Sequence, residues 1–203
     1  MRVRALVLAA AVAFGVISVE ALPMTRDPVA HADPMAERPL DRVVELALTR
    51  LRTGDTVAAA KWVSAAASGT EPVIDDPARE AVVYDAMARA GAELGVPEDW
   101  VRQVFFGQIE ANKMVQRGLL ARWRFDPAAA PTTAPNLAAV RPVIDRVNGE
   151  IVAQLAAHRA ELSGPGCAER LATSVFPSLT SGSADALHQA ALVRASAALC
   201  SPD

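Results

Sequence analysis

Apolar residues recur along this chain at intervals of three and four, and no segment alternates apolar with polar residues as a β-strand does. The clearest case is the stretch from Leu40 to Leu51. Its apolar members are Leu40, Val43, Val44, Leu46, Leu48 and Leu51. This spacing gives a helix one apolar face, and such a face must be buried against another helix. The pattern therefore predicts an all-α fold, a single-domain helical bundle.

Turn and capping residues indicate where the helices begin and end. Gly54 is expected to stop the first helix, and Asp55 to cap a second one that runs from Val57 to about Ala67. Asp76-Pro77 is typical of a helix start, because a capping carboxylate precedes a proline at the first helical position. The later helices are expected from Pro77 to about Gly95, from Pro97 to about Phe125, from Asn136 to about Leu162, over 167–175 and over 183–200. Pro142 must break or tighten the first turns of the helix that Asn136 caps.

The first 32 residues have the pattern of an export signal. Arg2 and Arg4 precede an apolar run from Ala5 to Val19, and small-residue cleavage motifs end at Ala21 and at Ala32. The first motif is closer to the apolar run, whereas the second directly precedes the polar stretch that follows. We predict a signal peptide over 1–32 and one domain over 33–203. The apolar run is shorter than the about 20 residues that span a bilayer, so the mature chain is expected not to be a membrane protein.

The charge balance argues against a nucleic-acid partner. The whole chain has a formal net charge of −3, and residues 1–32 contain three Arg, one Glu and one Asp. Removing them would leave about one more negative charge on the mature chain. General nucleic-acid-binding proteins normally show a basic excess instead.

The two cysteines, Cys167 and Cys200, both lie in the C-terminal part of the chain. In an exported protein they are expected to form a disulfide, with a pair of free thiols as the alternative. Such a bond would tie the C-terminal helical segment together and contribute about 3 kcal/mol by loop-entropy arguments.

Lysine is rare in this chain. Lys61 and Lys113 are the two lysines among its 20 basic residues, and both lie in apolar, helix-forming stretches. Burying an ammonium group is costly unless an anion meets it. The two lysines therefore indicate a pocket for a small, doubly charged anion.

Other cations and amides recur at helical spacings around these lysines. Arg50 precedes Lys61 by 11 residues, close to three helical turns, so the two share a side if the break at Gly54-Asp55 only shifts the helix axis. Asn112 and Gln116 share a helix face, with Lys113 adjacent. Near two helix starts lie Asp76, Arg79, Glu80 and Arg141. A helical arginine is more often solvated or paired with an acid, and Asp76 has a capping role open to it, so spacing alone leaves both interpretations open.

Standard catalytic motifs are absent from the sequence. It contains no HExxH, no Cys/His zinc spacing, no glycine-rich phosphate loop and no nucleophile elbow. The histidines are His31, His158 and His188, which are scattered. These observations argue against a Ser-His-Asp or metal mechanism, and we expect neither a metal nor another cofactor.

Several motifs, taken in order, carry a family resemblance. They are Arg50-Leu51, Asp55-Thr56-Val57-Ala58-Ala59-Ala60-Lys61-Trp62, Asp75-Asp76-Pro77-Ala78-Arg79-Glu80, Val104-Phe105-Phe106-Gly107-Gln108-Ile109-Glu110-Ala111-Asn112-Lys113, Val115-Gln116, Leu119-Leu120-Ala121-Arg122-Trp123, and Leu137 to Asp145 around Arg141. In sequence and spacing they resemble the exported chorismate mutases of the all-helical AroQ type, γ subclass. The cysteines also match the disulfide of mycobacterial-type members. The resemblance covers about 38–200.

The resemblance implies conversion of chorismate to prephenate, a unimolecular Claisen-type rearrangement. Chorismate carries two carboxylates and a hydroxyl group, and negative charge builds on its ether oxygen in the transition state. No proton transfer, metal or covalent intermediate is needed. The enzyme must hold the reactive conformer and present fixed donors to that oxygen.

Roles carried over by resemblance fall first on the cations and on one amide. Lys61 is implied to donate to the ether oxygen and to one carboxylate, and Gln116 to donate to the ether oxygen from the other side. Arg50 and Arg141 are implied to clamp the two carboxylates, and Arg79 to support them.

The remaining matched residues concern the hydroxyl end of the substrate. Asp76, Glu80 and Asn112 are candidates for this end and for orienting the cations. Lys113 belongs to the same matched motif and ranks last as a substrate contact, with support of the residues that touch the substrate as the alternative. The resemblance further implies a homodimer in which each chain builds its own site.

The chain departs from the family pattern in two places, at Gln116 and at Val82-Val83. Some members carry Glu where this chain has Gln116, and a carboxyl group donates there only when protonated, so we predict activity that does not require acid pH. Val82 and Val83 stand where members carry Gln, which makes one wall more apolar. Pro142 can change how Arg141 is presented.

Two alternatives to the mutase remain open from the sequence. Isochorismate–pyruvate lyase chemistry uses a similar anion pocket on the same scaffold. A non-catalytic exported helical protein that binds an anion or a partner belongs to a different class, and Lys61→Ala would leave its function mostly unaffected.

Overall fold

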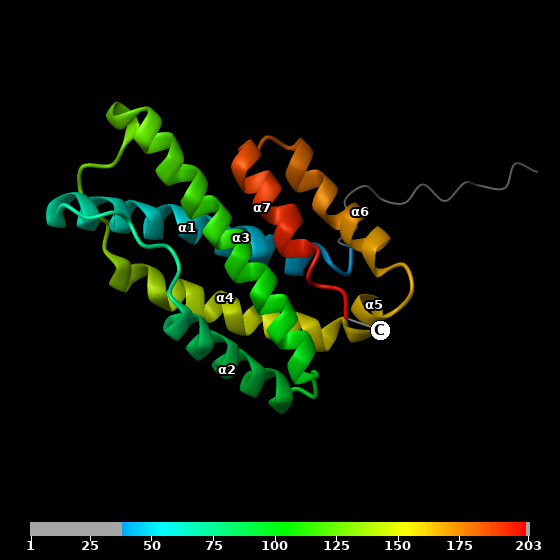
Figure 1. Cartoon of the computed structure of the whole chain (residues 1–203). Coiled ribbons are helices and arrows are strands. Elements are labelled where there is room, and N and C mark those ends of the chain that lie inside the picture. The colour runs from blue at the N-terminus through cyan, green and yellow to red at the C-terminus, as the bar shows by residue number, and fades with distance from the viewer. Residues whose placement is uncertain (1–37, 202–203) are drawn as a thin grey trace, which may run out of the picture. The chain divides into compact units, whose positions relative to one another are not determined.

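The structure is a computed structural model that describes residues 38–201. These residues form seven α-helices and one short 3-10 helix, and they contain no strand (Figure 1). The helices are α1 (Asp41–Ser68), α2 (Pro77–Glu93), α3 (Glu98–Phe125), α4 (Leu137–Ala157), α5 (Arg159–Ser163), α6 (Cys167–Thr180) and α7 (Ala186–Ser196), with η1 (Pro127–Ala129) between α3 and α4. The predicted all-α fold is confirmed. The predicted signal peptide and its cleavage motifs lie outside the described residues.

The expected stop at Gly54 is wrong, because α1 is one continuous helix of 28 residues. Gly54 is buried, and a Cβ atom there would lie 3.1 Å from Asn112 Nδ2 and 3.3 Å from Val115 Cγ1. The missing side chain lets α3 approach α1 closely, and this packing outweighs the helix penalty of glycine, about 1 kcal/mol. Asp55 does not cap a helix, and its Oδ1 lies 3.0 Å from His188 Nε2.

The capping signals at Asp76 and Asn136 are confirmed. Asp76 accepts a hydrogen bond from the backbone N–H of Arg79 at 3.0 Å, and Asn136 accepts one from that of Ala138 at 3.0 Å. Each side chain thus satisfies a backbone donor that has no partner inside its helix. As a result, α2 and α4 begin at the residues directly after their caps.

Pro142 does not break α4. It is the sixth residue of the helix, so its missing N–H removes a single hydrogen bond near the start. The helix instead ends earlier than predicted, at Ala157, and α5 follows. Helix α6 runs through Pro177 to Thr180, beyond its predicted end, and α7 is shorter than predicted at both ends.

Helices α1 and α3 pack against each other at the centre of the described bundle. Figure 1 shows α2 and α4 on one side of this pair and α6 and α7 on the other, in agreement with the helix contacts. The main core includes Leu51, Trp100, Phe105, Ile151 and Leu192. This arrangement leaves α1, α2, α3 and α4 around one shared space.

The predicted disulfide is present and holds the C-terminal segment. Cys167 begins α6 and Cys200 follows α7, with their Cα atoms 6.0 Å apart. The same segment is bound to α3, because Trp100 Nε1 donates to the Leu199 carbonyl at 3.0 Å and Gln103 Nε2 donates to the Cys200 carbonyl at 2.8 Å. None of the helices in 38–201 is long and apolar enough to span a membrane.

Candidate functional site

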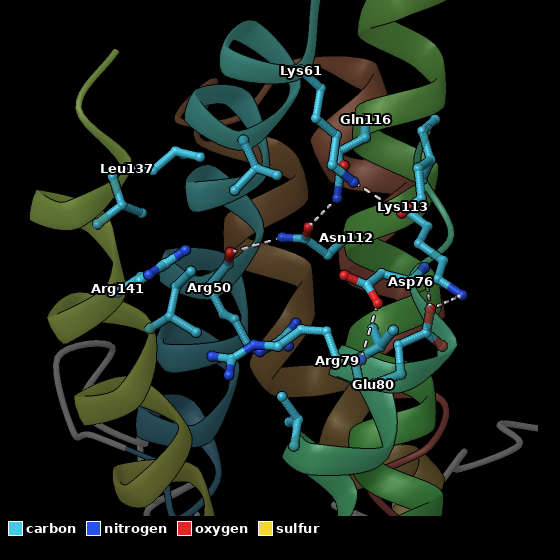
Figure 2. Close-up of a pocket in the computed structure, with 16 residues that line it drawn as sticks. Arg50, Lys61, Asp76, Arg79, Glu80, Asn112, Lys113, Gln116, Leu137 and Arg141 are labelled. Carbon is cyan, nitrogen blue, oxygen red and sulfur yellow. Dashed lines mark hydrogen bonds and ion pairs between the residues drawn. The ribbon is translucent and has the colours of Figure 1, made fainter. Parts of the chain in front are cut away.

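A cavity of about 330 Å³ lies between α1, α2, α3 and α4. Every site residue predicted from the sequence lines it, and Figure 2 shows most of them as they enter from the four helices. The predicted residues in its wall are Arg50, Lys61, Asp76, Arg79, Glu80, Asn112, Lys113, Gln116 and Arg141. The rest of the wall is apolar and consists of Val57, Ile74, Val83, Ile109, Leu137, Val140 and Ile144.

Arg50 is a buried cation with no ionic partner in the described part of the chain. Only 6% of it is exposed, and its bonds go to neutral acceptors: Nε donates to Asn148 Oδ1 at 2.9 Å, and Nη1 donates to the Gln108 carbonyl at 2.7 Å. Burial lowers the pKa of Arg50 to about 10. A buried charge without an ionic partner is costly, so this position favours the binding of an anion from outside the chain.

Lys61 reaches the cavity from α1, on the same side as Arg50, because α1 is not interrupted between them. Its Nζ donates to the Ile74 carbonyl at 2.9 Å and forms no ion pair within residues 38–201. Half-burial lowers the pKa of Lys61, although the charges of Asp76 and Asp75 act in the opposite direction. The ammonium group has three protons, so two remain for a ligand.

Arg79 and Arg141 face the cavity from α2 and α4. Both side chains are exposed, and neither forms an ion pair among the described residues. Arg141 lies on the second turn of α4, near the positive end of that helix. Together with Arg50 and Lys61, they give the cavity four cationic groups that no carboxylate of 38–201 neutralises through an ion pair.

Asn112 and Gln116 form a hydrogen-bonded chain whose direction is fixed. Asn112 Nδ2 donates to the Arg50 carbonyl at 3.2 Å, and Gln116 Nε2 donates to Asn112 Oδ1 at 2.8 Å. A carbonyl only accepts, so the first bond sets the orientation of Asn112, and Asn112 sets that of Gln116. The second Nε2 proton of Gln116 is left for a ligand.

Asp76 and Glu80 bring carboxylates to the wall. Asp76 caps α2, and Glu80, one residue beyond the usual capping-box position, accepts from the Asp76 N–H through Oε1 at 3.3 Å. Glu80 also pairs with Lys113, whose Nζ lies 2.8 Å away. Lys113 lines the cavity, but its ammonium group points to carboxylates.

Sequence reasoning missed the groups that orient the cations. Asn148 is 2% exposed and lies on an otherwise apolar face of α4 with Ile151 and Val152, so a polar residue among helically spaced apolar ones was a usable signal. The Ile74 and Gln108 carbonyls carry no such signal, because every residue has one.

The arrangement provides fixed donors and positive charge around an apolar-walled space. Within residues 38–201, no group of three His, Cys, Asp or Glu side chains is placed to hold a metal ion. His158 and His188 are not part of the cavity wall. Such a site is suited to binding a small dianion and to stabilising charge that develops on it.

Comparisons with known proteins point to one family. A family model described as chorismate mutase type II matches residues 41–117. A secreted chorismate mutase from Mycobacterium tuberculosis is 32% identical over 202 residues, which cover 98% of this chain and 96% of that protein. Another, from Mycolicibacterium smegmatis, is 34% identical over 184 residues, which cover 91% and 97%.

Solved structures agree with these sequence matches. The crystal structure of chorismate mutase from Burkholderia thailandensis superposes with a TM-score of 0.72 at 32% identity and covers 81% of this chain and 100% of that one. That of chorismate mutase from Burkholderia phymatum gives a TM-score of 0.71 at 33% identity, with coverage of 81% and 97%.

Proposed function

The chain belongs to the chorismate mutase type II family, and on that premise we propose that its cavity holds chorismate and rearranges it to prephenate with the residues described above. The protein is an exported chorismate mutase. Its family and relatives favour this activity over an isochorismate–pyruvate lyase and over a non-catalytic binding protein. We assign residues 1–32 as the signal peptide and 33–203 as the mature enzyme.

The reaction explains what the site must supply. In one concerted step the C–O bond of the enolpyruvyl ether breaks and a C–C bond forms, with no proton gained or lost. Catalysis therefore consists of holding the folded, reactive conformer and of stabilising charge on the departing ether oxygen. Fixed cations and amide donors can hold that conformer and stabilise the charge on the ether oxygen.

The burial of Arg50 without an ionic partner is the observation that carries the proposal. A guanidinium that is 6% exposed and bound only to neutral acceptors is matched by a substrate carboxylate. Asn148 and the Gln108 carbonyl hold it in place, so its remaining N–H groups are oriented before the substrate arrives. We assign the second carboxylate to Arg141, with Arg79 beside it.

Lys61 and Gln116 are the donors assigned to the ether oxygen. Lys61 has two protons left after its bond to the Ile74 carbonyl, one for the ether oxygen and one for a carboxylate. Gln116 has one Nε2 proton left after its bond to Asn112. Both groups are held by other residues, so they need little reorganisation as the C–O bond breaks.

We assign the substrate hydroxyl group to Glu80. Its carboxylate lines the cavity and accepts hydrogen bonds. Asp76 and Asn112 are orienting residues in this scheme. Asp76 caps the start of α2, the helix that carries Glu80, and Asn112 fixes the orientation of the Gln116 amide.

A homodimer is proposed for the assembly, as the resemblance implies. Since one chain supplies every group in the cavity wall, the rate per chain is expected to be independent of protein concentration. Light scattering after size exclusion gives the assembly state, and assays across a dilution series test the independence of the rate.

The decisive experiment follows the loss of chorismate absorbance with purified mature protein and with Lys61→Ala, at pH 5 and pH 7.5. Wild-type turnover to prephenate at both pH values, with a collapse in Lys61→Ala, supports the assignment and the pH-independent donor role of Gln116. A steep loss of wild-type activity between pH 5 and pH 8 would contradict that role. A folded wild type that leaves chorismate intact would contradict the function, and isochorismate is then the next substrate to assay.

A further inference from the structure

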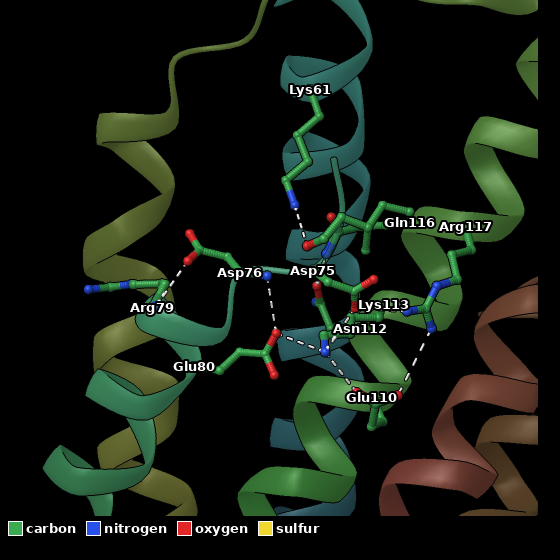
Figure 3. A network of polar contacts seen from close by, with 11 residues as sticks. Lys61, Asp75, Asp76, Arg79, Glu80, Glu110, Asn112, Lys113, Gln116 and Arg117 are labelled. Carbon is green, nitrogen blue, oxygen red and sulfur yellow. Dashed lines mark hydrogen bonds and ion pairs between the residues drawn. The ribbon is translucent and has the colours of Figure 1, made fainter. Parts of the chain in front are cut away.

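A network of ionic groups joins the connector between α1 and α2 to α3. We call Asp75, Glu80, Glu110, Lys113 and Arg117 the Lys113 cluster (Figure 3). Lys113 Nζ lies 2.8 Å from Glu80 Oε1, 2.9 Å from Glu110 Oε1 and 3.1 Å from Asp75 Oδ1. Arg117 Nη2 lies 2.9 Å from the same Asp75 oxygen. The cluster thus holds one residue of the connector, one of α2 and three of α3.

The ammonium group of Lys113 has no proton left for a substrate. It has three donors, and three carboxylates surround it. Burial alone would lower the pKa of Lys113, but hydrogen bonds to Glu80, Glu110 and Asp75 outweigh it and raise that pKa above its ordinary value. Its side chain is 11% exposed, so the charge is held firmly in place.

Asp75 connects this cluster to the donor that the reaction uses. Its neighbour Ile74 provides the carbonyl that receives Lys61 Nζ at 2.9 Å. The position of that carbonyl depends on the connector, and the connector is held at Asp75 by Lys113 and Arg117. Lys61 has a flexible four-carbon stem, so its ammonium group needs such an anchor to stay in one place.

The cluster also sets the charge next to the substrate. Its three carboxylates are offset by two cations, which leaves about one net negative charge. Without Lys113 the Glu80 carboxylate would face a dianionic substrate with no ion pair. Like charges in a half-buried site repel each other strongly.

We propose that Lys113 is a positioning residue: through Asp75 it anchors the Ile74 carbonyl that orients Lys61, and through its direct ion pair it holds Glu80 in the cavity wall. This role rests on the proposed function of the site. It replaces the substrate contact that the family resemblance implies for Lys113.

The sharpest test is Asp75→Asn, because Asp75 does not line the cavity. We expect kcat to fall about three- to tenfold with KM within about twofold, since the carboxylate clamps remain and Lys61 loses its fixed position. Asp85→Asn is the matched control: Asp85 of α2 pairs with Arg102 of α3 at 2.9 Å, and its exposure of 54% is close to the 59% of Asp75. The control should change neither constant.

Lys113 itself is tested by a pair of variants. Lys113→Met should lower kcat/KM at least tenfold, and it should raise KM because Glu80 then repels the substrate. Lys113→Arg should restore part of the loss, since it keeps the charge but its planar fork cannot meet three carboxylates at once. Thermal unfolding of each variant separates a positioning effect from loss of the fold.

The two-lysine composition allows a direct spectroscopic test. Protein labelled with 13C at lysine Cε gives one signal each for Lys61 and Lys113, and Lys61→Arg identifies which is which. Asp75→Asn should move the Lys61 signal and lower its titration midpoint, whereas Asp85→Asn should leave both signals in place. An unchanged Lys61 signal in Asp75→Asn overturns the proposal, whatever happens to kcat.

The failure of this proposal differs from the failure of the proposed function. If wild type does not rearrange chorismate, the function is wrong. If wild type is active, Lys61→Ala is inactive and Asp75→Asn keeps the full kcat, only the positioning role of Lys113 is wrong.

Discussion

At the scale of single residues, we expect Arg50 to serve binding without a benefit to folding. We expect Arg50→Met to lower kcat/KM about 10²- to 10³-fold while the free energy of unfolding stays within about 1 kcal/mol or rises. The reason is that a buried charge without an ionic partner is costly, and an apolar side chain of similar length removes that cost. Chorismate turnover and urea unfolding measure the two effects.

Arg146→Met is the matched control for Arg50→Met. Arg146 lies on α4, is more than half exposed and pairs with Glu150, so its loss should affect neither turnover nor unfolding measurably. If Arg50→Met instead unfolds far more easily than wild type, its loss of activity reports on the fold and the clamp role is unsupported.

The lowered pKa of Lys61 predicts an alkaline limit to activity. The charged form is the donor, so kcat/KM should fall as pH rises through a midpoint below 10.5, the ordinary value. The fold behaves in the opposite way: burial disfavours the charged form in the native state, so deprotonation contributes stability as pH rises between the lowered pKa and 10.5. Activity from pH 7 to 11, with circular dichroism in parallel, should show a loss of rate before any loss of helix.

The side chains of the site could be found from the sequence, but the backbone carbonyls that anchor them could not. The rare lysines in apolar stretches and the amide pair at Asn112 and Gln116 indicated an anion-binding pocket, because side-chain type and helical spacing are visible in the sequence. The carbonyl of Ile74 orients Lys61 only because a connector folds back over α1. Contacts of that kind depend on tertiary packing, so no local pattern predicts them.

At the scale of helices, glycines set how closely α3 can approach its neighbours. A Cβ atom at Gly107 would overlap the Cβ atom of Ala198, and both atoms are fixed to backbone. We expect Gly107→Ala to lower the free energy of unfolding by about 1 to 3 kcal/mol, because the C-terminal segment must move away from α3. Guanidinium unfolding followed by circular dichroism measures the change.

Gly149→Ala is the contrasting variant in α4. A Cβ atom there meets nothing within 4 Å, so the substitution should stabilise the protein by about 0.5 to 1 kcal/mol through better helix propensity. Equal effects of the two substitutions would contradict the close approach of the C-terminal segment to α3.

The helix boundaries show what periodicity predicts and where it fails. The starts at Pro77 and Leu137 were predictable, since a capping side chain acts within three residues of its own position. The stop predicted at Gly54 is wrong, and Pro142, which was predicted to break or tighten its helix, does not break it. The helix penalty of Gly54 is outweighed by close packing against α3, and Pro142 lies near the start of α4, where it removes a single hydrogen bond. Neither factor is visible in a short window of sequence.

At the scale of the whole molecule, the disulfide and the cavity lie in different parts of the bundle. No residue of α5, α6 or α7 lines the cavity. We therefore expect the double variant Cys167→Ser and Cys200→Ser to keep its kcat at 25 °C but to lose about 3 kcal/mol of stability, close to 10 °C in Tm. Kinetics and calorimetry test both parts, and a large drop in kcat at 25 °C would show that the two regions are coupled.

The continuity of α1 fixes the spacing between the backbone positions of two cavity residues. With 1.5 Å of rise per residue, the Cα atoms of Arg50 and Lys61 stand about 16 Å apart along one rod, and Gly54 does not interrupt it. The separation of these two attachment points does not change when neighbouring helices shift, so the two cations are placed relative to each other by their side chains and the groups that hold them. A one-residue insertion between Arg50 and Lys61 would rotate one attachment point by about 100° relative to the other, and the two cations would no longer face the same cavity.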